Sequence, residues 1–234
     1  MKKIVIGIFA LFLLLSFTGC DFFVTSWGSG MQRNLDSALK KESVEDLAKL
    51  ANNPQFQDPS SGTAVLNALS GKSETDIQAL SVSDQESIMD LALAVSIPTS
   101  LLNDLADIAQ DADNADPEEL FNTILGGINS FDTTVLQAIL SDEDVRESAS
   151  PESLVSASLA LVAQVMKREG ENLNFDDLAD LFNDDNDGVD ISPESKADIE
   201  AVKAVLDLFA ENGSRSDEEL SFFGMSFEDL FGGN

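Results

Sequence analysis

A recurring helix-start signal is the feature that most constrains how this chain can fold. In each copy, a serine or aspartate stands just before acidic residues and a series of spaced apolar residues. Such a side chain accepts hydrogen bonds from free backbone amides at a helix start, and acidic residues in the first turn favour the helix dipole. The signals stand at Ser43, Ser83, Asp116, Ser150 and Ser192. No stretch alternates apolar and polar residues as a half-buried strand does, so the sequence predicts an all-α fold.

The spacing of these signals bears on how the helices are arranged. Consecutive signals are 40, 33, 34 and 42 residues apart, which is in the range of helical-repeat proteins. However, apart from a capping residue followed by acidic residues and leucine, no sequence consensus recurs at this spacing. The sequence therefore leaves two arrangements open. The one we favour is an irregular bundle of short capped helices, and the alternative is a helical-repeat array.

The most apolar internal segment predicts the central helix of the core. Between Leu154 and Met166 only two serines and one glutamine are polar, and a helix that is apolar on all sides is buried. Ser150 and Gly170 supply its start and stop signals. The run of thirteen residues is too short to span a bilayer, which takes about 20 apolar residues.

Composition excludes several classes of function. The chain has 43 acidic and 13 basic residues, a formal net charge of −30, one cysteine and no histidine. Histidine-based catalytic triads and an intrachain disulfide are therefore impossible, and nucleic-acid binding is not expected because phosphate contacts need a basic patch. Carboxylates are so abundant that no catalytic pair stands out, so we expect a protein that is not an enzyme. We interpret the charge as a solvated acidic surface, with cation binding as the alternative.

The first twenty residues predict export. Lys2 and Lys3 precede an apolar run from Ile4 to Leu15, and small residues follow. The run is too short for a transmembrane helix but has the length of the apolar region of a secretory signal peptide.

The end of this segment, Phe17-Thr18-Gly19-Cys20, resembles the lipobox of bacterial lipoproteins, although Phe17 stands where leucine is usual. The resemblance implies that the Cys20 sulfur receives a diacylglycerol group and that cleavage falls between Gly19 and Cys20. The new amino group would then be acylated, for instance with palmitate. The alternative is an ordinary secretory signal in which Cys20 is incidental.

This interpretation sets the expected organisation of the chain. Residues 1–19 are a signal peptide that is removed, residues 20–30 are a lipid-attached tether, and residues 31–234 are an acidic helical domain. We expect the protein to be anchored on a bacterial membrane, facing the periplasm or the cell exterior. There it would bind a protein partner or help to assemble an envelope complex. A helical carrier of an apolar ligand is a further alternative.

Residues 183–194 form an acidic loop between two predicted helices. The loop places oxygen-bearing side chains at alternate positions around Gly188 and resembles the calcium loop of the EF-hand family. The resemblance implies Ca²⁺ as cofactor and the following ligands: the side chains of Asn183, Asp185, Asp187 and Glu194, and the carbonyl oxygen of Val189.

Three features of the loop differ from the family pattern. Asn183 replaces an aspartate, Asp190 takes the place of an apolar residue, and Pro193 stands beside Glu194. Asn, Asp and Gly also cluster in ordinary loops. We therefore favour a plain acidic connection and keep calcium binding as the alternative.

The C-terminal tail is rich in phenylalanine. We expect a last short helix after Ser216, in which Phe223, Phe227 and Phe231 would lie on one stripe because they are four residues apart. Such a stripe either packs on the domain, which we favour, or serves as a docking motif for a partner.

Overall fold

The computed structural model describes residues 37–98, 126–170, 175–182 and 190–210. It also describes residues 35, 100–101, 123, 173, 213–216, 221–222 and 225–226. The chain divides into two units, Met1–Lys41 and Glu42–Asn234. The expected signal peptide (1–19) and tether (20–30) lie in the first unit, outside the described residues. The second unit holds the helices that the structure describes with their bounds.

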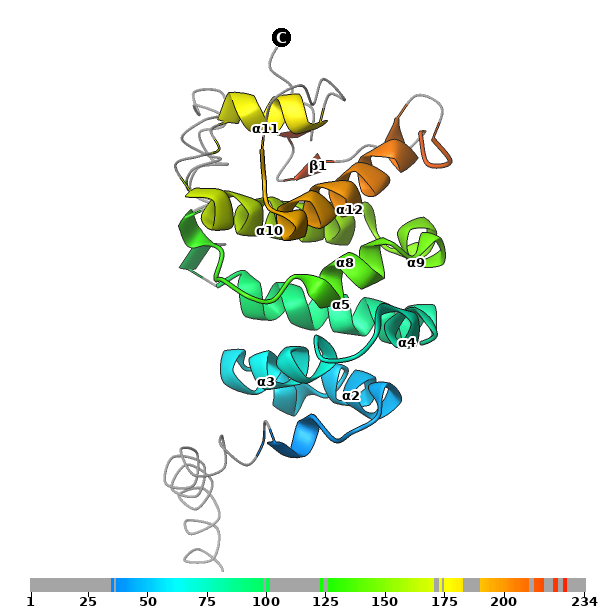
Figure 1. Ribbon diagram of the computed structural model, residues 1–234. Helices are drawn as coiled ribbons and strands as arrows, with labels where there is room; N and C mark the ends of the chain where they lie inside the picture. The colour runs from blue at the N-terminus through cyan, green and yellow to red at the C-terminus, as the bar shows by residue number, and fades with distance from the viewer. Residues whose placement is uncertain are drawn as a thin grey trace, which may run out of the picture. The chain divides into compact units, whose positions relative to one another are not determined.

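The described part of this second unit is built almost entirely of helices, which confirms the predicted all-α class (Figure 1). The helices are α2 (Val44–Ala51), η1 (Pro54–Phe56), α3 (Pro59–Leu69), α4 (Glu74–Gln78), α5 (Val82–Ser96), α8 (Thr134–Leu140), α9 (Glu143–Ser148), α10 (Pro151–Glu169), α11 (Phe175–Phe182) and α12 (Pro193–Phe209). Two strands, β1 (Ser221–Phe222) and β2 (Met225–Ser226), complete the described elements.

Serine caps start three of these helices where the sequence predicts them. The hydroxyl oxygens of Ser43, Ser150 and Ser192 accept hydrogen bonds from backbone amides three residues on, at 3.2, 3.1 and 3.3 Å. The predicted cap at Ser83 is wrong by two residues. Ser81 caps α5 instead and accepts from the Asp84 amide at 3.2 Å, so Ser83 lies inside the helix. The predicted start at Asp116 lies outside the described residues.

The α10 helix is the core helix that its composition predicts. Its side chains from Leu154 to Val165 are buried apart from the half-buried Ser156, and it packs against α5, α12 and β1. It ends at Gly170, whose φ of 59° is in the left-handed region that favours glycine.

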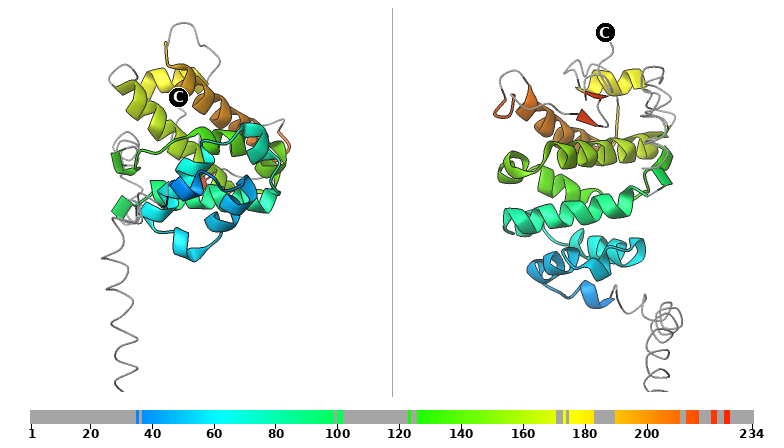
Figure 2. Two further views of the ribbon diagram at one scale, coloured as in Figure 1. Left: turned by 60° about the horizontal axis from the view of Figure 1, so that its bottom comes forward. Right: turned by 180° about the vertical axis from the view of Figure 1, so that it is seen from behind.

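The helices of the second unit from α2 to α10 are stacked in layers that keep chain order, whereas α11 lies beyond α12, which follows it in the chain (Figures 1 and 2). The first layer, α2 and α3, packs on α5, and α5 in turn contacts α8, α9 and α10. At Gly62 a Cβ atom would lie 2.6 Å from Val95 Cγ2, so only glycine lets α3 approach α5 this closely. Helix length varies from 5 residues in α4 to 19 in α10, and the arrangement is therefore irregular.

The C-terminal segment differs from its prediction. β1 pairs antiparallel with β2, Ser221 opposite Ser226 and Phe222 opposite Met225, so residues 221–222 and 225–226 are paired strands rather than parts of a helix. The sequence between them contains Gly224, and glycine is common in tight hairpin turns. The phenylalanines of the expected stripe, Phe223, Phe227 and Phe231, lie outside the described residues.

Among the helices that the structure describes, none is both long enough and apolar enough to cross a membrane.

Candidate functional site

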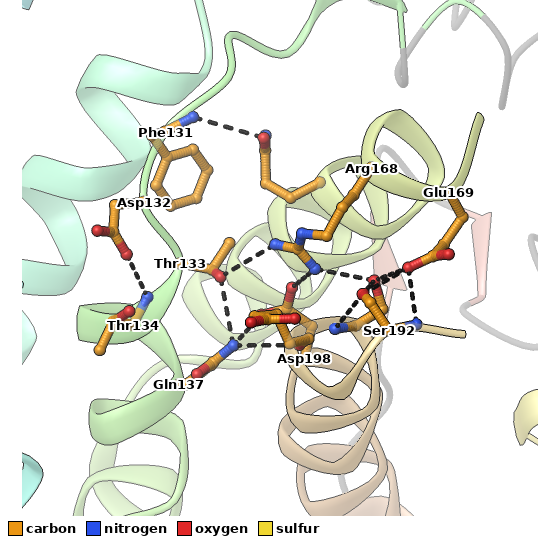
Figure 3. Close-up of polar contacts among 12 residues, drawn as sticks. Phe131, Asp132, Thr133, Thr134, Gln137, Arg168, Glu169, Ser192 and Asp198 are labelled. Carbon is orange, nitrogen blue, oxygen red and sulfur yellow. Dashed lines mark hydrogen bonds and ion pairs between the residues drawn. The ribbon is translucent and has the colours of Figure 1, made fainter. Parts of the chain in front are cut away.

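Three helices meet at a cluster of polar side chains, which we call the polar junction (Figure 3). The residues before and at the start of α8, the last turn of α10 and the first turns of α12 supply its members. These are Asp132, Thr133, Gln137, Arg168, Glu169, Ser192, Ser195 and Asp198. The position of Arg168 suits its charge, because a cation in the last turn of a helix favours the helix dipole.

Asp198 and Arg168 form the ion pair at the centre of the junction. Arg168 Nη1 donates to Asp198 Oδ2 at 2.9 Å, and Gln137 Nε2 donates to Asp198 Oδ1 at 2.6 Å. The Asp198 side chain is 0% exposed and that of Arg168 is 30% exposed. Burial raises the pKa of Asp198 because it penalises the charged form, and the hydrogen bonds from Gln137 and Arg168 only partly oppose this rise.

Glu169 joins the end of α10 to the start of α12. Its Oε1 accepts from the Ser192 amide at 3.1 Å, the Ser192 hydroxyl at 2.6 Å and the Ser195 hydroxyl at 2.5 Å. These serine hydroxyls hold the pKa of Glu169 below its usual range, since they stabilise the ionised form. The carboxylate thus adds a negative charge to the positive end of the α12 dipole.

A third carboxylate, that of Asp132, lies close enough to Arg168 for the guanidinium charge to lower its pKa. Asp132 Oδ1 accepts from the Thr134 amide at 3.0 Å. Burial alone would raise the pKa of Asp132, but bonds from Thr134 and Ser70, together with the charge of Arg168, leave it lowered. Asp198 is thus paired with Arg168, while Asp132 and Glu169 are influenced by its charge at longer range, and the junction carries a formal charge of −2 when all three carboxylates are ionised.

The junction is built to connect helices. The Ser195 hydroxyl donates to the Glu169 carboxylate, as a nucleophilic serine donates to its base. Ser195 is fully buried, however, so a substrate cannot reach it. Every hydrogen bond named above ties one helix to another or closes a helix start. The arrangement therefore fixes α12 against α8 and α10 through charge-assisted bonds, which are stronger than neutral ones.

The residues predicted to carry function lie largely elsewhere. Gly19 and Cys20 are outside the described residues, as are Asn183, Asp185, Asp187 and Val189. Glu194 is described, and it is an exposed residue in the first turn of α12. Within the described ranges, no three Asp, Glu, His or Cys side chains group closely enough to hold a metal ion, and this does not test the 183–194 loop.

The polar junction was not predicted from the sequence, although α12 carries a signal for it. Ser195 and Asp198 lie at positions that continue the buried stripe of Val202 and Val205. A charged residue on an otherwise apolar helix face requires a buried partner. Arg168, one of the few basic residues of the chain, is that partner.

No protein family matches this chain, and the comparisons with curated proteins and with solved structures found no match. A function for the chain must therefore be inferred from its residues and their geometry.

Proposed function

We propose that the protein is a lipid-anchored lipoprotein of the bacterial envelope that acts as a non-enzymatic binding or assembly module. The observation that carries the proposal is the arrangement of residues 1–20. A basic start and a short apolar run lead to Gly19 and Cys20, and Cys20 is the only cysteine in the sequence.

The anchor follows from the chemistry of that cysteine. Each buried methylene of an acyl chain contributes about 0.8 kcal/mol, and one chain alone gives only marginal membrane binding. A diacylglycerol on the sulfur of Cys20 together with an acyl group on its nitrogen supplies more than one chain. The attachment would therefore be stable, and the helical unit would remain near the membrane surface.

The binding or assembly role is supported by the character of the helical unit. The polar junction that it contains connects helices around the buried Asp198, which is a structural task. Its acidic side chains are largely exposed, among them Glu74, Asp76, Glu143 and Asp144. Exposed charge of one sign favours solubility and the attraction of oppositely charged partners, so a protein partner in the envelope is the expected target.

The test of the anchor compares Cys20→Ala with Ser26→Ala, a control six residues away. We expect the wild type and the control to partition into detergent and to begin at a lipid-modified Cys20 in mass spectrometry. Cys20→Ala should remain an unprocessed precursor. Cleavage of Cys20→Ala at the same bond would instead establish ordinary secretion.

A calcium-binding lipoprotein is the second candidate function. The observation that favours it is the helix on each side of the acidic loop, α11 ending at Phe182 and α12 beginning at Pro193. A loop held between two helices is the arrangement in which EF-hand ligands are presented. In this candidate Asp185, Asp187, Glu194 and the Val189 carbonyl bind the ion.

A further inference from the structure

The polar junction contains a bond that depends on the protonation of one buried carboxylate. We propose that the junction of α8, α10 and α12 is an acid-responsive contact. When Asp198 takes up a proton, Arg168 separates from it and the start of α12 loosens from α10. This contact belongs to the helical unit alone and does not depend on the proposed anchor.

The hydrogen-bonding capacity of the two partners explains why the bond breaks. Asp198 Oδ2 accepts from Arg168 Nη1 in the ionised state. Once protonated, Oδ2 presents an O–H to a guanidinium that has only donors and cannot accept. The Arg168 side chain is 30% exposed, so it has a path to water.

The other carboxylate oxygen is not free to take the proton. Gln137 Nε2 donates to Asp198 Oδ1 at 2.6 Å, to Thr133 Oγ1 at 3.3 Å and to the Glu194 carbonyl at 3.5 Å. Turning this amide to accept from a protonated Oδ1 would remove the bond that it donates to the Glu194 carbonyl. The Gln137 amide therefore directs the proton to Oδ2, the oxygen that holds Arg168 (Figure 3).

Among the carboxylates around Arg168, Asp198 takes the first proton as the pH falls. The Asp132 and Glu169 carboxylates are stabilised in their ionised form by hydrogen bonds from Thr134, Ser192 and Ser195. The Asp198 carboxylate is the most deeply buried of the three, and its pKa is raised.

The helices packed against α12 carry few charged groups near Asp198. α8 has no ionisable residue, and α10 contributes Arg168 and Glu169. α9 and α11 also pack on α12. Their described charged residues are Glu143, Asp144, Arg146, Glu147 and Asp177. The charge that acts on Asp198 is that of Arg168.

The change would take place in a folded chain. Because the pKa of Asp198 is higher in the folded state than in the unfolded state, this group adds to the free energy of unfolding when it is protonated. That contribution is fully present below the unfolded pKa and is lost as the pH rises through the folded pKa. When Arg168 leaves while Asp198 stays buried, the bond and charge that lower the pKa of Asp198 are lost, so its pKa is higher in the loosened state than in the paired state. Protonation therefore favours the loosened state and does not itself favour unfolding.

Hydrogen–deuterium exchange of the full chain in detergent micelles, with a chelator present, tests the proposal. Between about pH 7 and about pH 3.5, which is below the ordinary pKa of an aspartate, we expect the first amides of α12 to exchange about tenfold faster after correction for intrinsic rates. A factor of ten corresponds to about 1.4 kcal/mol. Asp198→Asn should show the faster exchange at both pH values. Glu200→Gln, an exposed control on the same helix, should behave as the wild type does.

Nuclear magnetic resonance of the wild type tests the same step without a variant. The carboxyl carbon of Asp198 and the guanidinium nitrogens of Arg168 should titrate with one common midpoint. The proposal is overturned if Asp198 titrates while the Arg168 signals stay constant. Protection of α12 that does not change with pH, or that still changes in Asp198→Asn, would also overturn it.

Discussion

At the scale of single residues, the excess of carboxylates lowers the free energy of unfolding at neutral pH, and Asp90 is a position where this effect can be measured. Asp90 lies one turn after Glu86 on α5. Burial, followed by the charge of Glu86, raises the pKa of Asp90. A carboxyl with a raised folded pKa favours folding when it is protonated, and that contribution is lost as the pH rises through the folded pKa. At neutral pH the ionised Asp90 therefore lowers the free energy of unfolding.

We expect Asp90→Asn to raise the melting temperature at about pH 7, because the amide removes a partly desolvated charge and its repulsion with Glu86. Below about pH 3 the wild-type carboxyl is itself neutral, so the difference should disappear. Thermal unfolding followed by circular dichroism at both pH values measures this. Glu200→Gln makes the same charge change on α12, away from Glu86, and should show a smaller effect. An equal gain in both variants would attribute the stabilisation to net charge alone.

At the scale of elements, α10 is the helix on which the others depend. It packs against α5 and α12, and its Leu159 and Leu161 side chains are 1% and 0% exposed. We expect Leu159→Ala or Leu161→Ala to lower the free energy of unfolding by about 2–5 kcal/mol, the usual range for a buried leucine. Denaturant unfolding of both variants and of Ser156→Ala, a half-buried control on the same helix, provides the measurement. A loss below about 1 kcal/mol at both Leu159 and Leu161 would mean that α10 is not the core.

Local sequence signals predict where helices occur better than where each one begins. Ser150 and Ser192 cap helices as predicted because each precedes a proline at the first helical position, where proline has no amide to satisfy. Ser81 and Ser83 both have an acidic residue three positions on. The structure uses Ser81, whose hydroxyl also donates to the Asp84 carboxylate at 2.7 Å. Where two caps compete, tertiary packing decides the start.

At the scale of the whole molecule, the sequence predicts the fold class and the core helix but not the polar junction. Asp132, Arg168 and Asp198 are each about 30 residues or more apart, so only tertiary packing brings them together. Helix signals are local and depend on neighbouring residues, whereas a buried ion pair depends on which helix faces touch. For the same reason the packing of β1 against α10 could not be predicted from the tail sequence.

Calcium binding by residues 183–194 would affect the stability of the whole molecule, because an ion that binds only the folded chain stabilises all of it. If residues 183–194 bind Ca²⁺, we expect Ca²⁺ at 100 times its dissociation constant to raise the free energy of unfolding by about 2.7 kcal/mol. Screening of the net charge of −30 would imitate part of this gain. Calorimetry with Mg²⁺ at equal ionic strength separates the two effects, since Mg²⁺ requires tighter octahedral geometry and retains more water.

Two double variants complete the calcium experiment. Asp187→Ala with Glu194→Ala removes two expected ligands and should abolish the specific response to Ca²⁺. Glu200→Ala with Asp207→Ala removes the same charge from α12 beyond the loop and should leave that response intact. Screening depends on total charge, so it would decrease equally in both variants, whereas coordination is lost only in the first. Equal responses to Ca²⁺ and Mg²⁺ in the wild type, or an undiminished Ca²⁺ response in the ligand variant, would make the loop a plain acidic connection between α11 and α12.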